Sequence, residues 1–416
     1  MNCWRTVWLG CALFAATTAS SAQTFTTLLS FNNANGSYPG AFLVQGTDGN
    51  LYGTTVGSDV IFKITTAGTL TTLYTFSGPD GRNPVGLTLG TDENFYGTTN
   101  EGGSSAACSN GCGTVFKITP GGVLTTLHSF DITDGSFPSA VLVQGTDGNF
   151  YGTTAYGGTD NSCVEYGMSG CGTIFRITPA GAFTTLHSFH ATDGWQPTSG
   201  LVEGTDGNFY GTTTLGGIVA GGAYKGGGTI FKISPKGALT TLYDFCSQTG
   251  CTDGQFPDAS LIQATDGNFY GTAADGGNAY CYYGQQGGTV FRITSAGRMT
   301  TLHSFCFTEG RIPAAPLLQA TDGNLYGTAD AGGNGGDSWC TAGFDVGCGT
   351  IFKVAVDTGL TTLVHTFDWT DGSNPVAALI QGTTERSTEQ PRKVVREMRP
   401  TLSVQYSGSL SARSRL

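Results

Sequence analysis

Side chains that could act as acids or bases fall into two groups, those that recur along the chain and those that occur once. Three histidines occupy the same position in the phrase TTLHSF, namely His128, His187 and His303. A catalytic side chain is expected to occur once and to lie beside an acid, base or nucleophile that assists it. A histidine that recurs at the same position of each repeat therefore indicates a structural role. Glu165, His190 and Asp337 lie outside the repeated phrases, but no catalytic motif surrounds them. The sequence therefore nominates no catalytic residue.

A second recurring acid is the aspartate of the phrase TDGN, which is found at Asp48, Asp147, Asp206, Asp266 and Asp322. Calcium-binding loops space their acids as DxDxDG, and that spacing is absent here. Asp-Gly is the preferred pair of a tight turn, because glycine accepts a positive φ. We therefore interpret these aspartates as turn residues, and we expect no metal site and no cofactor.

Ten of the 12 cysteines follow residue 22, and eight of them form close pairs: Cys108/Cys112, Cys163/Cys171, Cys246/Cys251 and Cys340/Cys348. Cys281 and Cys306 are left over as a candidate fifth pair. A CxxxC spacing resembles half of a zinc site, but no second half recurs at zinc spacing. We predict local disulfides, which form in oxidising compartments.

Four strand-sized phrases, rich in β-branched and aromatic residues, must position these side chains, and they recur in a fixed order. In one unit they are AVLVQGTDGN (140–149), FYGTT (150–154), GTIFRIT (172–178) and FTTLHSF (183–189). We name them strands A, B, C and D. Short turns join A to B and C to D, so each unit is predicted to be a four-stranded antiparallel sheet. Radial stacking of such sheets predicts an all-β protein, a β-propeller.

The phrases GTDGNFYGTT, GTVFKITP and LTTLHSF resemble the Gloeo/Verruco (GloVer-type) tandem-repeat family, and the resemblance covers residues 24–383. The resemblance implies an exported bacterial surface protein, often with a C-terminal sorting anchor. No such anchor is visible in this sequence. The resemblance implies no catalytic residues.

The repeat count predicts an incomplete ring. A lone D strand, TFTTLLSF (24–31), precedes six complete sets, and a lone A strand, NPVAALIQGT (374–383), follows them. We therefore expect six complete blades plus an incomplete seventh that the first strand helps to close. The alternative is a closed six-bladed ring. The repeat domain spans residues 23–383.

The composition changes after the last repeat phrase. Residues 384–416 carry seven Lys and Arg against three Asp and Glu, whereas residues 23–383 carry 11 against 27. In a shifted reading frame, permitted codons for this tail can spell DGTFYGTTAEGG and then GTVFRIT, which are strands B and C of the missing blade. We expect a basic tail that is disordered or frameshifted and stays outside the ring. Resequencing the source DNA decides between a genuine tail and a lost base.

The B–C and D–A loops are long and variable, and they share one face of the predicted propeller, which we call the long-loop face. It carries the candidate ligand-binding aromatic residues Trp195, Trp339, Trp369, Tyr156, Tyr224 and Tyr282. Aromatic rings on a wet face can stack on sugars or grip a protein. They can equally cap gaps between blades, and the sequence leaves both interpretations open.

The N-terminus predicts export. Residues 1–22 combine Arg5, an apolar run from Val7 to Ala16 and small residues before Gln23, the pattern of a signal peptide. We expect a secreted or cell-surface protein without a transmembrane segment after this peptide. The net charge of −11 disfavours nucleic acid as a partner. The function we predict is non-catalytic binding of a glycan or extracellular protein, or scaffolding. The alternative is a propeller lyase or hydrolase that acts on polysaccharide or peptide.

Overall fold

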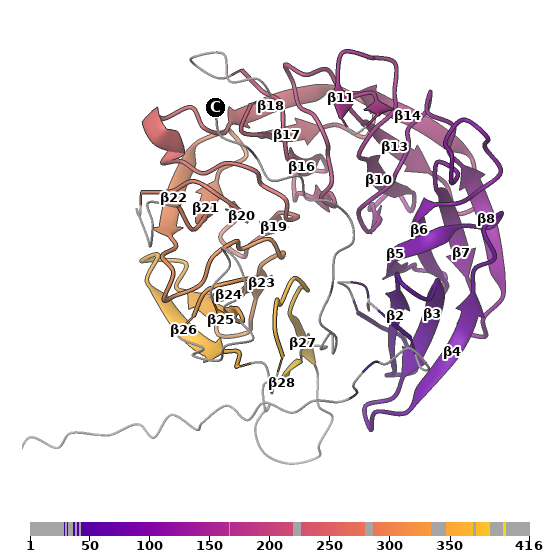
Figure 1. Ribbon diagram of the computed structural model, residues 1–416, viewed down its shortest axis with the longest axis horizontal. Helices are drawn as coiled ribbons and strands as arrows, with labels where there is room; N and C mark the ends of the chain where they lie inside the picture. The colour runs from indigo at the N-terminus through magenta and orange to yellow at the C-terminus, as the bar shows by residue number, and fades with distance from the viewer. Residues whose placement is uncertain are drawn as a thin grey trace, which may run out of the picture.

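The computed structural model describes residues 29, 31, 36, 37, 40, 43–165, 167–218, 226–278, 286–333, 347–368, 372–382 and 394–396. Within these ranges the fold is all β, and the single helix is the one-turn 3-10 helix η1 (Thr249–Cys251). The strands form six four-stranded sheets and smaller pairs. Figure 1 shows the sheets arranged as blades around a ring. The predicted β-propeller with six complete blades is confirmed.

The blades follow the chain in order. Blades 1 to 3 are β1 (Val44–Gln45), β2 (Leu51–Thr55), β3 (Val60–Ile64) and β4 (Leu70–Thr75); β5 (Arg82–Leu89), β6 (Phe95–Glu101), β7 (Thr114–Ile118) and β8 (Leu124–Ser129); and β9 (Val143–Gln144), β10 (Phe150–Thr154), β13 (Thr173–Ile177) and β14 (Phe183–Ser188). Blade 3 also carries a small hairpin in its B–C loop, β11 (Val164–Glu165) with β12 (Met168–Ser169).

Blades 4 to 6 are β15 (Val202–Glu203), β16 (Phe209–Thr213), β17 (Thr229–Ile233) and β18 (Leu239–Asp244); β19 (Ile262–Gln263), β20 (Phe269–Ala273), β21 (Thr289–Ile293) and β22 (Met299–Ser304); and β23 (Leu318–Gln319), β24 (Leu325–Ala329), β25 (Thr350–Val354) and β26 (Thr361–Thr366). A last pair, β27 (Ile380–Gly382) with β28 (Val394–Arg396), follows blade 6. In Figure 1 the first strand of a blade lies at the inner edge of the ring and the fourth at the outer edge.

The TDGN phrase forms the turn that the sequence predicts. Asp147 Oδ1 accepts a hydrogen bond from the Asn149 backbone N–H at 3.0 Å, and its Oδ2 accepts one from the Tyr151 hydroxyl at 2.8 Å. Gly148 has a φ of +81°, which a side chain would strain. The carboxylate thus links the turn to the second strand of its blade. The predicted turn role of the repeated aspartate is confirmed.

Contacts between blades are repeated as faithfully as contacts within them. The Thr98 hydroxyl in β6 donates to the Ala140 carbonyl of the next blade at 3.1 Å. The Tyr96 ring stacks on Phe150 of that blade, with centroids 3.9 Å apart. On the face opposite the long-loop face, where the A–B turns lie, the Thr91 N–H donates to Gln144 Oε1 at 2.9 Å. Equivalent bonds join the later blades, so the ring is held by directional contacts as well as by apolar burial.

The first strand of the seventh blade makes the same contacts. The Thr321 N–H donates to Gln381 Oε1 at 3.0 Å, and the Thr328 hydroxyl donates to the Ala377 carbonyl at 3.4 Å. The backbone of β28 pairs with β27, with Val395 opposite Gln381. Strand B takes this position in a complete blade, so residues 394–396 pair with the ring although the tail was expected to stay outside it. The proposal of a shifted frame is separate and stays a proposal.

The N-terminal segment has a defined place at Phe31, although most of the predicted strand 24–31 lies outside the described residues. In blades 1 to 5 the Phe that follows the D strand packs against the C-strand Phe of the next blade, as Phe130 does against Phe175, with centroids 5.2 Å apart. Phe31 lies 5.3 Å from Phe62 of blade 1 in the same way. Phe31 therefore occupies the position of a D-strand Phe from a preceding blade, which in a closed ring is the seventh.

The repeated turn acid also predicts a response to pH. Burial raises the pKa of Asp206, but hydrogen bonds from Asn208, Tyr210 and Lys232 outweigh it and lower the pKa from 3.8 to about 2. Because the pKa of Asp206 is lower in the folded protein, its ionised carboxylate contributes to stability. This contribution is complete above pH 3.8 and is lost as the pH falls through about 2. We expect the free energy of unfolding to fall with acid in this window and Asp206→Asn to weaken the fall. Urea denaturation at several pH values tests this, and equal slopes for both proteins would contradict it.

Candidate functional site

The predicted disulfides form where the structure describes both cysteines. Cys108–Cys112, Cys163–Cys171 and Cys246–Cys251 are bonded. Cys306 and Cys348 each take part in a further disulfide. Their predicted partners, Cys281 and Cys340, lie outside the described residues. Disulfides in this number indicate an oxidising environment.

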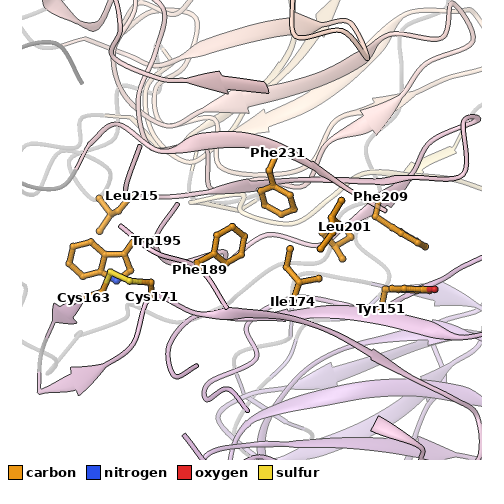
Figure 2. Close-up of a cluster of buried hydrophobic side chains, with 11 residues drawn as sticks. Tyr151, Cys163, Cys171, Ile174, Phe189, Trp195, Leu201, Phe209, Leu215 and Phe231 are labelled. Carbon is orange, nitrogen blue, oxygen red and sulfur yellow. A yellow bond between two sulfur atoms is a disulfide. The ribbon is translucent and has the colours of Figure 1, made fainter. Parts of the chain in front are cut away.

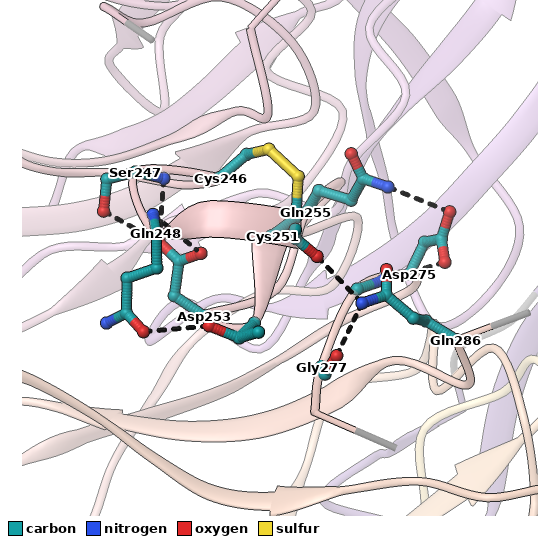
Figure 3. Close-up of a disulfide and its surroundings, with 12 residues drawn as sticks. Cys246, Ser247, Gln248, Cys251, Asp253, Gln255, Asp275, Gly277 and Gln286 are labelled. Atoms are coloured by element: carbon teal, nitrogen blue, oxygen red, sulfur yellow. Dashed lines mark hydrogen bonds between the residues drawn. A yellow bond between two sulfur atoms is a disulfide. The ribbon is translucent and has the colours of Figure 1, made fainter. Parts of the chain in front are cut away.

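The disulfide Cys246–Cys251 sits in a D–A loop that is held from within (Figure 3). Asp253 is fully buried and accepts hydrogen bonds from the Ser247 N–H at 3.0 Å, the Ser247 hydroxyl at 2.8 Å and the Tyr243 hydroxyl at 2.8 Å. The carboxylate is therefore satisfied by its own loop. This loop is structural, and we assign no ligand to it.

Of the six candidate aromatic residues, the structure describes two, Trp195 and Tyr156. Trp339, Trp369, Tyr224 and Tyr282 lie outside the described residues. Trp195 is only 6% exposed and belongs to a core cluster with Leu215 and the Cys163–Cys171 disulfide (Figure 2). An indole enclosed in this way cannot serve as an open stacking platform. Trp195 therefore takes the packing role, one of the two interpretations that the sequence left open.

The recurring histidines are paired structurally. Each one lies on the outer strand of its blade and bonds through Nε2 to an acid of the following D–A loop. The pairs are His128–Asp134 at 2.9 Å, His187–Asp193 at 3.1 Å and His303–Glu309 at 2.9 Å. These bonds tie each outer strand to the next loop, which is the structural role that the repeated histidines predict.

Of the three non-repeated candidates, two are described and Asp337 lies outside the described residues. His190 follows the outer strand β14 and is largely exposed, and its Nδ1 lies 2.8 Å from Asp160 Oδ2. The second, Glu165, lies in β11, and the Gln196 side-chain amide donates to its Oε2 at 2.6 Å. Through Gln196, Glu165 joins a larger polar group.

That group begins with Gln196, which sits just before inner strand β15. Its Nε2 donates to the Tyr156 hydroxyl at 2.7 Å as well as to Glu165. Gln196 is 9% exposed, whereas Tyr156 and Glu165 are partly exposed. The Tyr156 ring meets Phe137 edge to face, with centroids 6.0 Å apart. A buried amide thus orients a phenol and a carboxylate at the inner end of the long-loop face.

A second polar group adjoins it through the backbone. The Thr214 N–H and the Thr198 N–H both donate to the Gln196 carbonyl at 2.9 Å, and the two threonine hydroxyls lie 2.7 Å apart. Thr214 also hydrogen-bonds to Asp258, which belongs to the next blade. We call Tyr156, Glu165, Gln196, Thr198, Thr214 and Asp258 the inner-edge cluster.

The pKa of Asp258 is strongly shifted. Burial raises its pKa from 3.8 to about 6, although the hydrogen bond with Thr214 opposes the shift. Carboxyl groups whose pKa is raised toward neutrality are common in functional sites. It is also a source of instability once the carboxyl is charged.

We expect Asp258→Asn to raise the free energy of unfolding at pH 8 by about 1–2 kcal/mol. The pKa of Asp258 is higher in the folded than in the unfolded protein, so its protonated carboxyl contributes to stability. This contribution is complete below pH 3.8 and is lost as the pH rises through about 6. The neutral amide removes this cost, and the gain should shrink at pH 4. Urea denaturation at both pH values measures it, with the exposed Asp357→Asn as control. A gain that is the same at both pH values would contradict the cause.

Sequence reasoning missed Gln196, Thr214 and Asp258, although a signal was present. The residue after the proline of strand A is Ser139, Thr198, Asp258 or Ala314 in successive blades, so Asp258 is the one acid in this series. Comparison of equivalent positions across blades would have singled it out. Its burial and its contact with Thr214 come from a neighbouring blade.

The arrangement can bind polar groups but does not form a metal centre. In the described part of the chain, no group of three or more His, Cys, Asp and Glu side chains could hold a metal ion. No helix in these ranges has the length and apolar character that a membrane crossing needs. The inner-edge cluster offers carboxyl, amide and hydroxyl groups beside aromatic rings.

Solved structures with a similar fold include two lyases. The chain aligns with virginiamycin B lyase from Staphylococcus aureus with a TM-score of 0.54 and 16% identity, covering 85% of this chain and 91% of that one. A streptogramin B lyase structure aligns with a TM-score of 0.52 and 13% identity, covering 84% and 88%. At these identities the likeness concerns the fold alone.

The sequence comparison is specific at the level of the family. No curated protein sequence matches the chain significantly. The family model of the Gloeobacter/Verrucomicrobia repeat matches residues 11–218 and 162–387, two overlapping stretches that span most of the chain. The same repeat builds each blade of the ring described above. The chain therefore belongs to the Gloeobacter/Verrucomicrobia repeat family.

Proposed function

We propose that the protein is an exported, non-catalytic binding protein whose long-loop face contacts a glycan or an extracellular protein through the inner-edge cluster. The observation that carries the proposal is the bonding of Gln196 to Tyr156 and Glu165 at 2.7 and 2.6 Å. These three side chains are not copied in the other blades. The polar groups that are copied already serve the turns and the contacts between blades.

The chemistry of the cluster supports a polar ligand. Carboxyl, amide and hydroxyl groups in a fixed arrangement suit ligands rich in hydroxyl or amide groups, and the neighbouring aromatic rings supply apolar contact area. Glu165 and Asp258 disfavour a negatively charged ligand, as does the net charge of −11. Nucleic acid is therefore not proposed as a partner.

The disulfides support a place of action outside the reducing cytoplasm. With the signal-peptide pattern of residues 1–22, they are the basis for proposing a secreted or cell-surface protein. Non-reducing peptide mapping of material made with its leader in an oxidising compartment tests this part. Free thiols at Cys163 and Cys171 would count against it.

The binding proposal is tested by localising a ligand on the ring. A glycan array and an array of extracellular matrix proteins, probed with the full chain, identify the ligand. Hydrogen exchange with and without it then reports where the amides become protected. We expect protection in peptides that cover 156–171 and 190–198, with none at the TDGN turns of the opposite face. Protection confined to those turns would refute the proposed face.

A propeller lyase or hydrolase is the second candidate, and one observation favours it. Asp258 has a pKa of about 6, which suits a general acid near neutral pH. Mass spectrometry of the bound ligand after long incubation separates the two candidates. A cleaved product that Asp258→Asn no longer forms would establish the enzyme, whereas recovery of the intact ligand supports binding.

A further inference from the structure

The residue before the proline of strand A has an unusual backbone in blades 2 to 6 and in the incomplete seventh blade. Its φ is positive at Asn83 (52°), Phe137 (56°), Gln196 (57°), Phe256 (59°), Ile312 (58°) and Asn374 (52°). A residue that precedes proline normally adopts an extended conformation. A positive φ strains any side chain, and a β-branched residue such as Ile312 most of all.

Hydrogen bonds between blades explain the backbone conformation. The Phe137 N–H donates to the Cys112 carbonyl of the preceding blade at 3.0 Å, and the Gln196 N–H donates to the Cys171 carbonyl at 3.1 Å. The carbonyls of these two residues accept from Ala155 and Thr214 at 3.1 and 2.9 Å. The same pattern returns in later blades. The main chain at this position therefore joins neighbouring blades whatever side chain it carries.

These bonds do not explain why a side chain is present. Glycine adopts a positive φ without strain, and this chain contains 66 glycines, many of them in that conformation. At the TDGN turn the repeat uses glycine for its positive φ, with Glu93 (φ 63°) as the exception. Before the proline, in contrast, all six residues carry a side chain. Strain that persists where glycine would relieve it indicates that the side chains are used.

The six side chains differ in chemistry while their backbone and the proline stay constant. Amides stand at Asn83, Gln196 and Asn374, aromatic rings at Phe137 and Phe256, and an aliphatic group at Ile312. All except Gln196 are at least partly exposed. Gln196 and Phe137 reach Tyr156, which places both at the long-loop face. Variable side chains on an invariant scaffold are typical of positions that determine specificity.

We propose that these six residues, the pre-proline ring, determine specificity in a ligand site around the inner edge of the long-loop face, and that the site takes a neutral sugar chain. This inference rests on the proposed binding function and narrows it to one ligand class. The amides of Asn83 and Asn374 can exchange hydrogen bonds with sugar hydroxyls, whereas Gln196 acts through Tyr156 and Glu165, which its amide orients. The Phe137 ring can cover the C–H surface of a pyranose, and Phe256 packs against the core cluster that holds Trp195. Glu165 and Asp258 accept from further hydroxyls and disfavour acidic sugars.

Calorimetric titration of the full chain with neutral cello-, xylo- and malto-oligosaccharides tests the proposal, with oligogalacturonate as the acidic probe. The variants are Gln196→Gly and Phe137→Gly, which remove the side chain and relieve the strained φ. Glu93→Gly is the matched control, because it makes the same change at a positive φ on the opposite face. We expect each ring variant to weaken binding of a neutral sugar at least 10-fold and the control to stay within 2-fold. Unfolding midpoints should show that all three proteins remain folded.

The outcomes separate this inference from the binding function. Unchanged sugar affinity in both ring variants overturns the pre-proline ring but leaves the binding protein intact. Binding of oligogalacturonate alone, or of a protein ligand without any neutral sugar, overturns the ligand class. If a glycine variant fails to fold, Gln196→Asn replaces it, because asparagine tolerates a positive φ but is too short to reach Tyr156 and Glu165 together. A 10-fold loss is expected there as well, and full affinity would refute the role of Gln196.

Discussion

Trp195→Ala is expected to lower the free energy of unfolding by about 3–5 kcal/mol. The indole is 6% exposed and packs with Leu215 and the Cys163–Cys171 disulfide, which come from different loops. Truncation removes the apolar contacts and leaves a cavity between the disulfide and the next blade. The cavity cannot collapse easily, because the disulfide and the strand pairing hold its walls in place.

Urea denaturation followed by far-ultraviolet circular dichroism measures this effect. Val164→Ala is a suitable control, since Val164 follows Cys163 in the loop that packs on Trp195 but is 58% exposed and should change stability by less than about 0.5 kcal/mol. A loss below about 1 kcal/mol for Trp195→Ala would show that the indole is not a packing anchor. Ligand affinity measured on the folded fraction would then show whether Trp195 contacts a ligand directly.

Phe31→Ala is expected to cost about 3–5 kcal/mol, as much as the same change at Phe130. Phe31 is 3% exposed and packs with Leu51, Phe62 and Ile64 of blade 1, while Phe130 makes the equivalent contact one blade further on. A residue in an unattached N-terminal segment would cost little when truncated. A large loss therefore indicates that this segment closes the ring across the seventh position.

The comparison of Phe31→Ala with Phe130→Ala makes the test specific. Val123→Ala, at a residue that is 67% exposed, provides the baseline. Limited proteolysis complements the denaturation data, since loss of the closing contact should expose blade 1 first. Equal stability of Phe31→Ala and the baseline variant would show that blade 1 is stable without the N-terminal segment.

Local chemistry made several features predictable. The Asp-Gly turn of TDGN uses hydrogen bonds within five residues, and Cys108–Cys112 closes over a separation of four residues. The alternation of strand phrases and turns therefore determined the blades, their order and the incomplete seventh blade without reference to distant residues. Short-range hydrogen bonds and covalent links depend on sequence neighbours, which the sequence displays directly.

Burial was decided only by the tertiary structure. The sequence left open whether Trp195 binds a ligand or packs between blades, and the structure shows it enclosed by Leu215 and the Cys163–Cys171 disulfide. The sequence did not single out Asp258, whose pKa is raised to about 6 by burial although the hydrogen bond with Thr214 of the preceding blade opposes the shift. β28 found its partner in β27 although the tail carries no repeat phrase.

The division has a physical reason. Strand and turn formation depend on local backbone preferences and on the period of apolar residues, which a repeat restates in every unit. The environment of a side chain on the long-loop face depends on which loops of neighbouring blades fold over it, and these loops differ from unit to unit. The sequence by itself therefore determined the ring, its turns and its local disulfides, while the tertiary structure decided that Trp195 packs and that Gln196, Glu165 and Asp258 belong to one polar cluster.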